Sequence, residues 1–336
     1  MKAIGYRQNL PVDHTDALLD LELPAPAPGA RDLLVRVKAI SVNPVDTKVR
    51  RNSPPPEGQA RVLGWDAVGT VEALGAAVAK FKPGDRVYYA GAINRPGANS
   101  ELHTVDERIA ALAPNSLDDT QAAALPLTTI TAYELLFDRL RVAQGGGAGQ
   151  TLLVIGGAGG VGSILIQLAR QLTQLRVVAT ASRAETRQWC LDLGAHAVID
   201  HSKPLATELL AAGEGQADFV AALTQTAHHY PQIIEALKPQ GAIGCIDDMD
   251  GLDAMKLKTK ALSLHWELMF TRPMFETPDM HRQGELLAEV AQLVDAGRVR
   301  TTASENFGSI NAASLKRAHA LIESGRALGK VVLAGF

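Results

Sequence analysis

Cysteine and aromatic residues are scarce in this chain. Of its 336 residues only two, Cys190 and Cys245, are cysteines, and 4% are aromatic. Two cysteines cannot form a disulfide framework, nor can they provide a zinc site made of four cysteines. The length is too great for one compact domain and suits two.

The sequence also lacks an excess of charge of one sign and any long apolar run. Its 33 Lys and Arg residues against 36 Asp and Glu give a net charge of -3, so strong attraction to nucleic acid or to an anionic membrane is not expected. Apolar runs such as Thr151–Ile155 are far too short to span a bilayer, and the first residues show no signal-peptide core. We therefore expect a cytoplasmic protein that binds a small-molecule substrate, with no nucleic acid and no membrane as partner.

Glycine and proline punctuate the first third of the chain at short intervals. Between them, Leu33–Val42 (LLVRVKAISV) is partly alternating and rich in β-branched residues, which is typical of a strand. Two more strands are expected at Gly64–Leu74 and Asp85–Ala90. This pattern favours a small barrel or sandwich over parallel βα units.

From Thr151 onward, strand-like and helix-like segments alternate. The expected strands are Thr151–Ile155, Val177–Thr180, Ala197–Ile199, Phe219–Ala222 and Ala242–Ile246, and the expected helices are Gly160–Leu172, Ala184–Leu193 and Tyr230–Leu237. This order predicts a doubly wound parallel sheet. After Trp266 the sequence predicts two helices, about Gln283–Ala296 and Ala312–Glu323, and a closing strand, Val331–Leu333.

A glycine-rich motif of the type G-x-G-x-x-G joins the first expected strand of this sheet to its first helix. It follows the strand TLLVI and opens the helix VGSILIQLARQL. Glycines there let the backbone approach a pyrophosphate, to which the helix N-terminus offers free N–H groups and partial positive charge. A tight turn without a ligand is the alternative. The residues expected to bind the dinucleotide are Gly157, Gly159, Gly160, Val161 and Gly162.

The residues after the second strand of the sheet indicate which dinucleotide binds. A free ribose 2′-hydroxyl usually meets an Asp or Glu about 20 residues past the glycines. This chain instead has Ser182 and Arg183, with Arg187 one turn later. A carboxylate would repel a 2′-phosphate, whereas Ser and Arg would bind it, so we predict NADP, as NADPH, over NAD. In the alternative, both arginines are solvated charges on the helix surface.

Several short motifs occur in the order known from one superfamily. They are MKAIGY (1–6), VNPVD (42–46), GWDAVGTV (64–71), KPGDRV (82–87), the pair LP and TAY within 125–133, the glycine loop, and GKVVL (329–333). On these motifs the chain resembles the medium-chain dehydrogenase/reductase superfamily, and within it the zinc-free quinone oxidoreductase branch, whose members are often called zinc-type alcohol dehydrogenase-like. The resemblance covers essentially the whole chain.

The resemblance implies an α/β fold in which a GroES-like, β-rich catalytic domain is joined to a Rossmann domain with a doubly wound parallel sheet. The catalytic domain would comprise residues 1–126 and, after the chain returns, 266–336, and the NADP-binding domain residues 127–265. A homodimer is implied in which edge strands near Ala261–Leu264 pair. The resemblance also adds Thr129, His201 and Lys330 to the residues that bind the cofactor.

Zinc alcohol dehydrogenases of the superfamily place Cys, His and Cys around the metal. The matching positions here are Asn43, Trp65 and about Leu127. Trp and Leu cannot bind zinc and Asn binds it poorly, and the lobe that holds a structural zinc is missing. We therefore expect no metal, with an adventitious zinc as the contrary interpretation. The nine histidines form no pair with metal-ligand spacing beyond His228 and His229, whose adjacent side chains are poorly placed to share a metal.

The expected reaction follows from the missing metal. Without a Lewis acid, an unactivated ketone or alcohol is a difficult substrate, whereas an alkene conjugated to a carbonyl accepts a hydride more readily. The protein then mainly orients the nicotinamide and the acceptor and excludes water. The resemblance agrees, and it implies NADPH-dependent reduction of quinones, enones or alkenals. The alternatives are a zinc-free dehydrogenase of simple ketones or alcohols, and an NADPH-binding protein with little turnover.

Asn43, Asp46 and Trp65 are the expected catalytic-site residues. The resemblance places Asn43 near the nicotinamide ribose and the substrate carbonyl, where its amide could hydrogen-bond a developing enolate oxygen, and Asp46 would orient its neighbours. The alternative is an Asx turn before Pro44, with Asp46 as a surface charge. Several related enzymes carry a tyrosine where this chain has Lys48, so the proton donor stays unidentified, with Lys48 as one candidate.

Three aromatic residues, Trp65, Trp266 and Phe270, are expected to wall the substrate pocket. The two later ones belong to the segment His265–Arg272, where the chain crosses between the expected domains. Ligand clefts favour such boundaries. In the alternative, each is a residue of a packed core.

Overall fold

The computed structural model describes residues 1–249 and 251–336. The chain forms two compact units, one made of Met1–Ile130 with Phe270–Phe336 and the other of Thr131–Met269. The boundaries expected from the sequence, after residues 126 and 265, lie a few residues before these divisions.

The first unit is built mainly from antiparallel strands. They are β1 (Lys2–Tyr6), β2 (Leu19–Glu22), β3 (Asp32–Val42), β4 (Arg61–Val62), β5 (Ala67–Leu74), β6 (Arg86–Tyr89), β7 (Leu102–Asp106), β8 (Ala110–Leu112), β15 (Ala303–Asn306) and β16 (Lys330–Ala334). One sheet has the order β15-β16-β3-β5-β6-β8, with β7 also paired to β3, and a smaller sheet has the order β2-β1-β4. The three strands expected in the first third of the chain correspond to β3, β5 and β6.

Strand β3 organises this unit because it pairs with β5, β7 and β16. Its residues Leu33, Val35, Ile40 and Val42 are buried, and burial of such side chains is the main favourable contribution to folding. The strand ends at Val42, and the next residue, Asn43, is the N-cap of the helix α1 (Pro44–Asn52). The end of β3 therefore positions the first group of candidate site residues.

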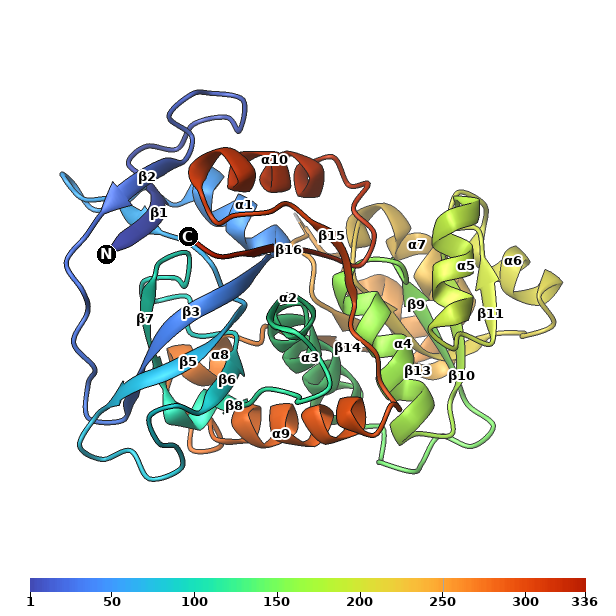
Figure 1. Ribbon diagram of the computed structural model, residues 1–336. Helices are drawn as coiled ribbons and strands as arrows, with labels where there is room; N and C mark the ends of the chain where they lie inside the picture. The colour runs from blue at the N-terminus through green and yellow to red at the C-terminus, as the bar shows by residue number, and fades with distance from the viewer. Residues whose placement is uncertain (250) are drawn as a thin grey trace. The chain divides into compact units, whose positions relative to one another are not determined.

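Helices of the first unit cover its sheets. They are α1 (Pro44–Asn52), α2 (Asp119–Ala123), α3 (Pro126–Tyr133, which ends in the second unit), α8 (Thr271–Met274), α9 (Arg282–Asp295) and α10 (Ala312–Glu323), with the short 3₁₀ helix η1 (Glu107–Ile109). Helices α1 and α10 lie side by side (Figure 1). Arg50 of α1 links them, since its guanidinium donates to His319 at 3.3 Å and pairs with Glu323.

The second unit contains a parallel sheet with the strand order β11-β10-β9-β12-β13-β14. Its elements are β9 (Thr151–Ile155), α4 (Gly160–Leu172), β10 (Arg176–Thr180), α5 (Ala184–Asp192), β11 (Ala197–Ile199), α6 (Leu205–Ala211), β12 (Ala217–Ala222), α7 (Thr226–Ala236), β13 (Leu237–Cys245), β14 (Ser263–Trp266), the π-helix η2 (Glu134–Arg139) and the 3₁₀ helix η3 (Ala254–Lys260). Because the order reverses between β9 and β12, right-handed crossovers place α4 and α5 on one face and α7 on the other, as Figure 1 shows. The doubly wound sheet expected from the sequence is present.

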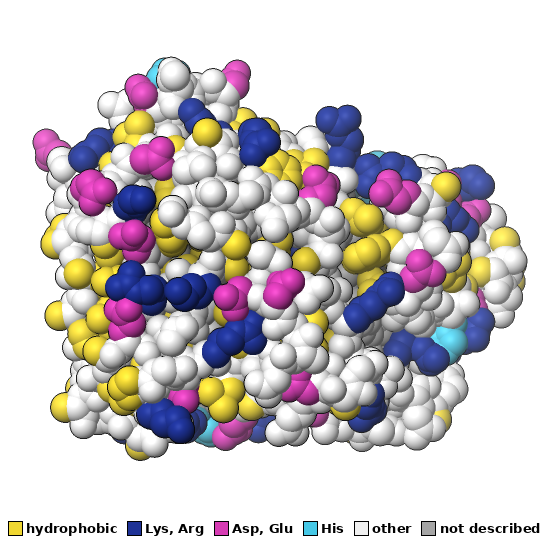
Figure 2. All heavy atoms as spheres, in the orientation of Figure 1, with side chains coloured by type: hydrophobic (Ala, Val, Ile, Leu, Met, Phe, Trp, Pro, Cys, Tyr) yellow, Lys and Arg dark blue, Asp and Glu magenta, His cyan; other side chains and the backbone are white. Residues whose placement is uncertain are grey.

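The distribution of charge on the surface and the apolar character of the helices are as expected from the small net charge and the short apolar runs of the sequence. Basic and acidic side chains are interspersed on the face that Figure 2 shows, without a stripe of one sign. Within residues 1–249 and 251–336, no helix is long and apolar enough to span a bilayer.

Candidate active site

Asn43 and Asp46 form a buried helix start directly after β3. Asn43 is the residue before α1, and Pro44 occupies the first helical position, where its fixed φ and missing N–H are well tolerated. The Asp46 carboxylate accepts the backbone N–H of Asn43 at 2.7 Å and that of Gly64 at 3.0 Å. Asp46 is thus a buried residue of the helix cap, not the surface charge of the alternative interpretation. Burial raises the pKa of Asp46 to about 7 against the opposing effects of the Asn43 N–H and the Lys330 charge.

A second carboxylate, Asp66, joins Asn43 to a buried lysine. Asp66 accepts the Asn43 side-chain N–H at 2.9 Å and the backbone N–H of Leu127 at 2.8 Å, and it pairs with Lys330 at 3.1 Å. The Lys330 ammonium also donates to the Asn43 amide oxygen at 2.5 Å and to the carbonyl of Val42 at 2.9 Å. Burial raises the pKa of Asp66 and lowers that of Lys330, and each partner's charge opposes the shift of the other.

A zinc ion does not fit this donor set. Three positions match the zinc ligands. The amide oxygen of Asn43 accepts a hydrogen bond from the Lys330 ammonium group. Trp65 is 1% exposed and its indole N–H donates to the Ala92 carbonyl at 3.2 Å, whereas Leu127 presents a backbone N–H that donates to Asp66. A lysine cation already lies among them. No cluster of three or more His, Cys, Asp or Glu side chains suited to a metal occurs in the described part of the chain.

The three aromatic residues expected around the substrate lie in different surroundings. Trp65 and Phe270 are buried and meet edge to face, with ring centroids 6.0 Å apart. Trp266, at the end of β14, is 51% exposed. Lys48, the candidate proton donor, is an exposed residue of α1. Trp65 and Phe270 therefore form one aromatic pair within the first unit, and Trp266 belongs to the surface of the second.

The glycine loop lies between β9 and α4, as the motif predicts. A Cβ on Gly162 would lie 2.4 Å from the carbonyl oxygen of Gly156, and one on Gly157 would lie 2.7 Å from Ala179. Packing within the protein therefore requires these two glycines. A Cβ on Gly159 would meet only the Gly156 carbonyl at 3.5 Å, an ordinary contact. Close approach of a ligand to the N-terminus of α4 would explain a glycine at this position.

The two arginines after β10 differ in their surroundings. Arg183 is the exposed residue before α5, next to exposed Ser182. Arg187, one turn later, donates to the carbonyls of Ala181 at 3.3 Å and Val198 at 2.8 Å. Arg187 thus ties the ends of β10 and β11 together and is not the solvated charge of the alternative interpretation.

Two residues that the resemblance adds to the cofactor contacts carry buried polar atoms without a hydrogen-bond partner among the described residues. They are the hydroxyl of Thr129 and Nδ1 of His201. An unpaired buried polar atom is costly, and a bound ligand would remove that cost. Within the second unit, His201 and Gly159 are therefore each compatible with a bound dinucleotide.

A group of three histidines escaped the sequence analysis, which considered only the adjacent pair. His201, after β11, lies with its ring centroid 6.0 Å from that of His229, which is 4.9 Å from that of His228. Burial lowers the pKa of His229, and the other two histidines add to this. The fold brings the third ring to the pair, because His201 follows β11 whereas His228 and His229 belong to α7.

A buried pair of carboxyl groups, Glu134 and Glu267, was also missed. Glu134 is in η2 and Glu267 directly follows β14, and the two buried carboxyl groups lie close enough to repel each other when both are charged. Arg139 donates to Glu267 at 2.7 Å. Burial is the largest cause that raises the pKa of Glu267, to about 9, and repulsion from Glu134 is the second. The positive charge of Arg139 opposes this shift. The pair therefore holds a proton at neutral pH.

This pair predicts that stability falls as pH rises. The folded protein keeps a proton that the unfolded chain releases above the usual carboxyl pKa of about 4.3, so the stabilisation is present below that value and is lost as pH rises towards the folded pKa of about 9. Glu267→Gln should unfold at a higher temperature than the wild type at pH 8.5, by roughly 2–4 °C, and less so at pH 5.5. Glu134→Gln is the matched variant and should behave alike. Equal pH dependence of all three proteins in a thermal melt would contradict the shared proton.

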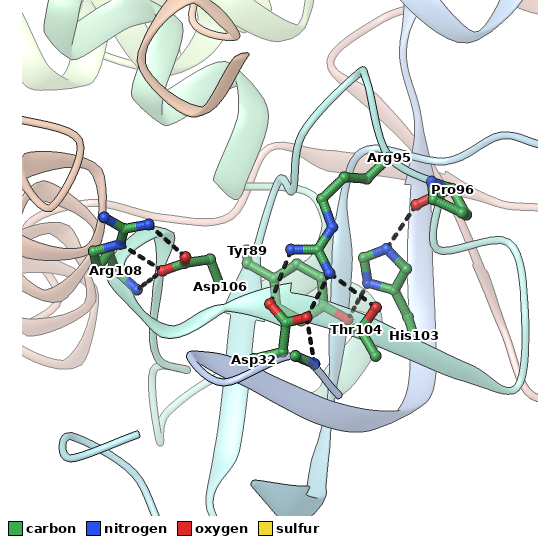
Figure 3. A network of polar contacts seen from close by, with 9 residues as sticks. Asp32, Tyr89, Arg95, Pro96, His103, Thr104, Asp106 and Arg108 are labelled. Carbon is green, nitrogen blue, oxygen red and sulfur yellow. Dashed lines mark hydrogen bonds and ion pairs between the residues drawn. The ribbon is translucent and has the colours of Figure 1, made fainter. Parts of the chain in front are cut away.

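A separate cavity of about 180 Å³ lies within the first unit. Figure 3 shows a network of polar contacts that includes several of the residues lining this cavity, Arg95, His103, Thr104, Asp106 and Arg108. Arg95 donates to both oxygens of Asp32 at 2.9 and 2.8 Å, and Arg108 donates to Asp106 at 2.9 and 2.7 Å. His103 has a nitrogen atom 3.0 Å from the Pro96 carbonyl, which can only accept. These charged groups are paired within the protein, and the cavity includes neither Asn43 nor Lys330.

Comparison with known proteins places the chain in a family. Residues 29–114 match the alcohol dehydrogenase GroES-like domain and residues 193–333 the zinc-binding dehydrogenase domain. A zinc-type alcohol dehydrogenase-like protein of Staphylococcus aureus is 39% identical over 99% of both chains. The chain belongs to the medium-chain dehydrogenase/reductase superfamily and is an oxidoreductase of that class. The family and fold class expected from the sequence are thereby confirmed.

Solved structures of similar fold extend over the whole chain. A protein of Rhizobium etli assigned to the zinc-dependent alcohol dehydrogenases has a TM-score of 0.97 and 56% identity, covering 100% of this chain and 98% of its own. The quinone oxidoreductase of Escherichia coli, in complex with NADPH, has a TM-score of 0.84 and 25% identity over 99% and 100%. An NAD-dependent alcohol dehydrogenase has a TM-score of 0.84 and 26% identity over 100% of both chains. A nicotinamide cofactor is common to the last two.

Proposed function

We propose that the protein is an NADPH-dependent, zinc-independent reductase of quinones or α,β-unsaturated carbonyl compounds. The observation that carries this proposal is the buried group of Asn43, Asp66 and Lys330, in which an amide occupies one of the three positions that match zinc ligands and an ammonium ion lies beside it. Without a Lewis acid to polarise an isolated carbonyl, a conjugated acceptor is the easier substrate.

The cofactor would be held by residues that the sequence and the fold both suggest. The glycine loop at the N-terminus of α4 would bind the pyrophosphate, and Ser182 and Arg183 would bind the 2′-phosphate. The unpaired atoms of Thr129 and His201 would gain partners. The bound cofactor supplies the hydride, and the chain's own residues orient the acceptor and exclude water.

Asn43 is the group proposed to act on the substrate. As a hydride reaches the β-carbon, the electrons of the conjugated double bond move towards the carbonyl oxygen, which becomes an enolate. An N–H of the Asn43 amide would stabilise this oxygen. A proton then completes the reduction at the α-carbon. Asp46 holds the backbone of Asn43 in place through the helix cap.

The test is a comparison of acceptors under one set of conditions. NADPH oxidation should be fast with a quinone or an enone and slow with a saturated ketone, and the enone product should be the saturated ketone, not the allylic alcohol. Faster reduction of simple ketones would support the zinc-free carbonyl dehydrogenase instead. NADPH binding without oxidation by any acceptor would support a binding protein with little turnover.

A homodimer through β14 is part of this proposal. Strand β14 is at the edge of the six-stranded sheet, close to the segment Ala261–Leu264 that the resemblance implies. An unpaired strand edge readily pairs with another chain, and β14 carries Trp266 with half of its surface exposed. The expected mass in solution is twice the chain mass of 35.6 kDa, and a light-scattering mass of one chain at micromolar concentration would contradict the dimer.

A further inference from the structure

Lys330 donates all of its ammonium hydrogens to groups within the first unit. Its side chain is 3% exposed. The three acceptors are the carbonyl of Val42, the amide oxygen of Asn43 and the carboxylate of Asp66. An ammonium group has three N–H donors, so none is left for the phosphate groups of a cofactor. This arrangement differs from the cofactor contact that the sequence led us to expect for Lys330.

The same contacts determine which way the Asn43 amide faces. Lys330 can only donate, so the amide atom beside it must be oxygen, and the carboxylate of Asp66 can only accept, so the atom beside it must be nitrogen. In a flipped amide, the NH2 group would face the Lys330 ammonium, which is also a donor, and the oxygen would face the Asp66 carboxylate, which is also an acceptor. The nitrogen has two N–H groups. One is bound to Asp66, and the other has no protein partner among the described residues.

We propose that Lys330 is a positioning residue, which together with Asp66 fixes the Asn43 amide so that its second N–H faces the carbonyl oxygen of the substrate. This inference rests on the proposed function. A hydrogen bond accepted from a cation polarises the amide and strengthens the hydrogen bond that the amide donates. Lys330 transfers no proton and touches no substrate, and its charge acts through one intervening side chain.

The proposal also gives a reason for burying an ion pair that contributes little to stability by itself. Burying a lysine and an aspartate costs desolvation that their attraction does not reliably offset. Val42, Asn43 and Leu127 satisfy the remaining donors and acceptors of the pair. This arrangement fixes the Asn43 amide at the end of β3. A preorganised N–H donor of this kind stabilises negative charge that develops in the transition state.

A double-mutant cycle tests whether Lys330 acts through Asn43. Lys330→Met should lower kcat about ten- to a hundredfold, the size of effect expected when a reacting group is misplaced. The dissociation constant of NADPH, measured by calorimetry, should stay unchanged. In the Asn43→Ala background, Lys330→Met should have no further effect on kcat, because a residue that acts only through another contributes nothing once that residue is gone. Lys330→Arg keeps the positive charge and the hydrogen-bond donors, so it should recover part of the activity.

Two outcomes would overturn the proposal. One is a loss of NADPH affinity in Lys330→Met with little change in kcat, which would make Lys330 a cofactor ligand. The other is independent, multiplicative effects of the two substitutions on kcat.

If Lys330→Met does not fold because Asp66 is left unpaired, Lys330→Met with Asp66→Asn removes both charges, and the same cycle with Asn43→Ala applies. If the wild type reduces simple ketones instead of enones, the proposed function fails, yet the cycle can be run with a ketone because its oxygen also gains charge.

Discussion

Asn43→Ala is expected to lower kcat with an enone acceptor by about a hundred- to a thousandfold, the loss typical of removing one donor from a developing oxyanion. The substitution removes the only side-chain amide of the Asp66 and Lys330 group. It also removes a residue from the start of α1, but loss of a helix cap costs only about 1 kcal/mol. The variant should therefore fold, bind NADPH with wild-type affinity in a calorimetric titration, and fail in the chemical step.

A matched control is available two residues earlier. Ser41 is buried, and its hydroxyl has no hydrogen-bond partner among the described residues. Ser41→Ala therefore removes a similar buried polar atom without breaking the contacts of Asn43, and it should leave kcat unchanged. Unchanged kcat in Asn43→Ala, or an equal loss in both variants, would mean that Asn43 does not stabilise the transition state.

Arg183→Ala is expected to weaken NADPH binding about ten- to a hundredfold, because a hydrogen bond to a charged group contributes about 1.5–3 kcal/mol. Arg183 and Ser182 are exposed where β10 leads into α5, which is where the 2′-phosphate is proposed to bind. NADH has no such phosphate, so its affinity should barely change, and the two affinities should converge in the variant. Fluorescence titration with both cofactors measures this directly.

Arg187 provides the control for that experiment. Its guanidinium is bound to the carbonyls of Ala181 and Val198, so Arg187→Ala should lower thermal stability and affect both cofactors alike. A wild type that prefers NADH, or an Arg183→Ala variant that loses both cofactors equally, would remove the case for NADPH.

Features that depend on neighbouring residues could be predicted from the sequence. The glycine loop between β9 and α4 combines a strand, fixed glycines and a helix within a few residues, and the alternation after Thr151 gave the doubly wound sheet. The helix α1 was missed, although Asn43, Pro44 and Asp46 have the spacing of a helix start. Here Asn43 was interpreted as an active-site residue, with an Asx turn before Pro44 as the alternative, and the helix-start signal was overlooked.

Contacts between distant residues could not be found in this way. Lys330 and Asn43 are 287 positions apart, and nothing near either residue indicates the other. The same is true of Glu134 and Glu267, which meet because η2 lies against the end of β14. The alternatives considered for Asp46 and Arg187 placed both in solvent, whereas the fold gives each a set of backbone partners.

The central claim is that reduction of a conjugated carbonyl proceeds here without zinc. The most direct measurement is the rate of NADPH oxidation with an enone before and after exhaustive treatment with a chelator, with the zinc content of the same sample measured by elemental analysis. The account predicts substoichiometric zinc and an unchanged rate. One tightly held zinc per chain, with the activity lost on chelation and restored by zinc, would contradict it.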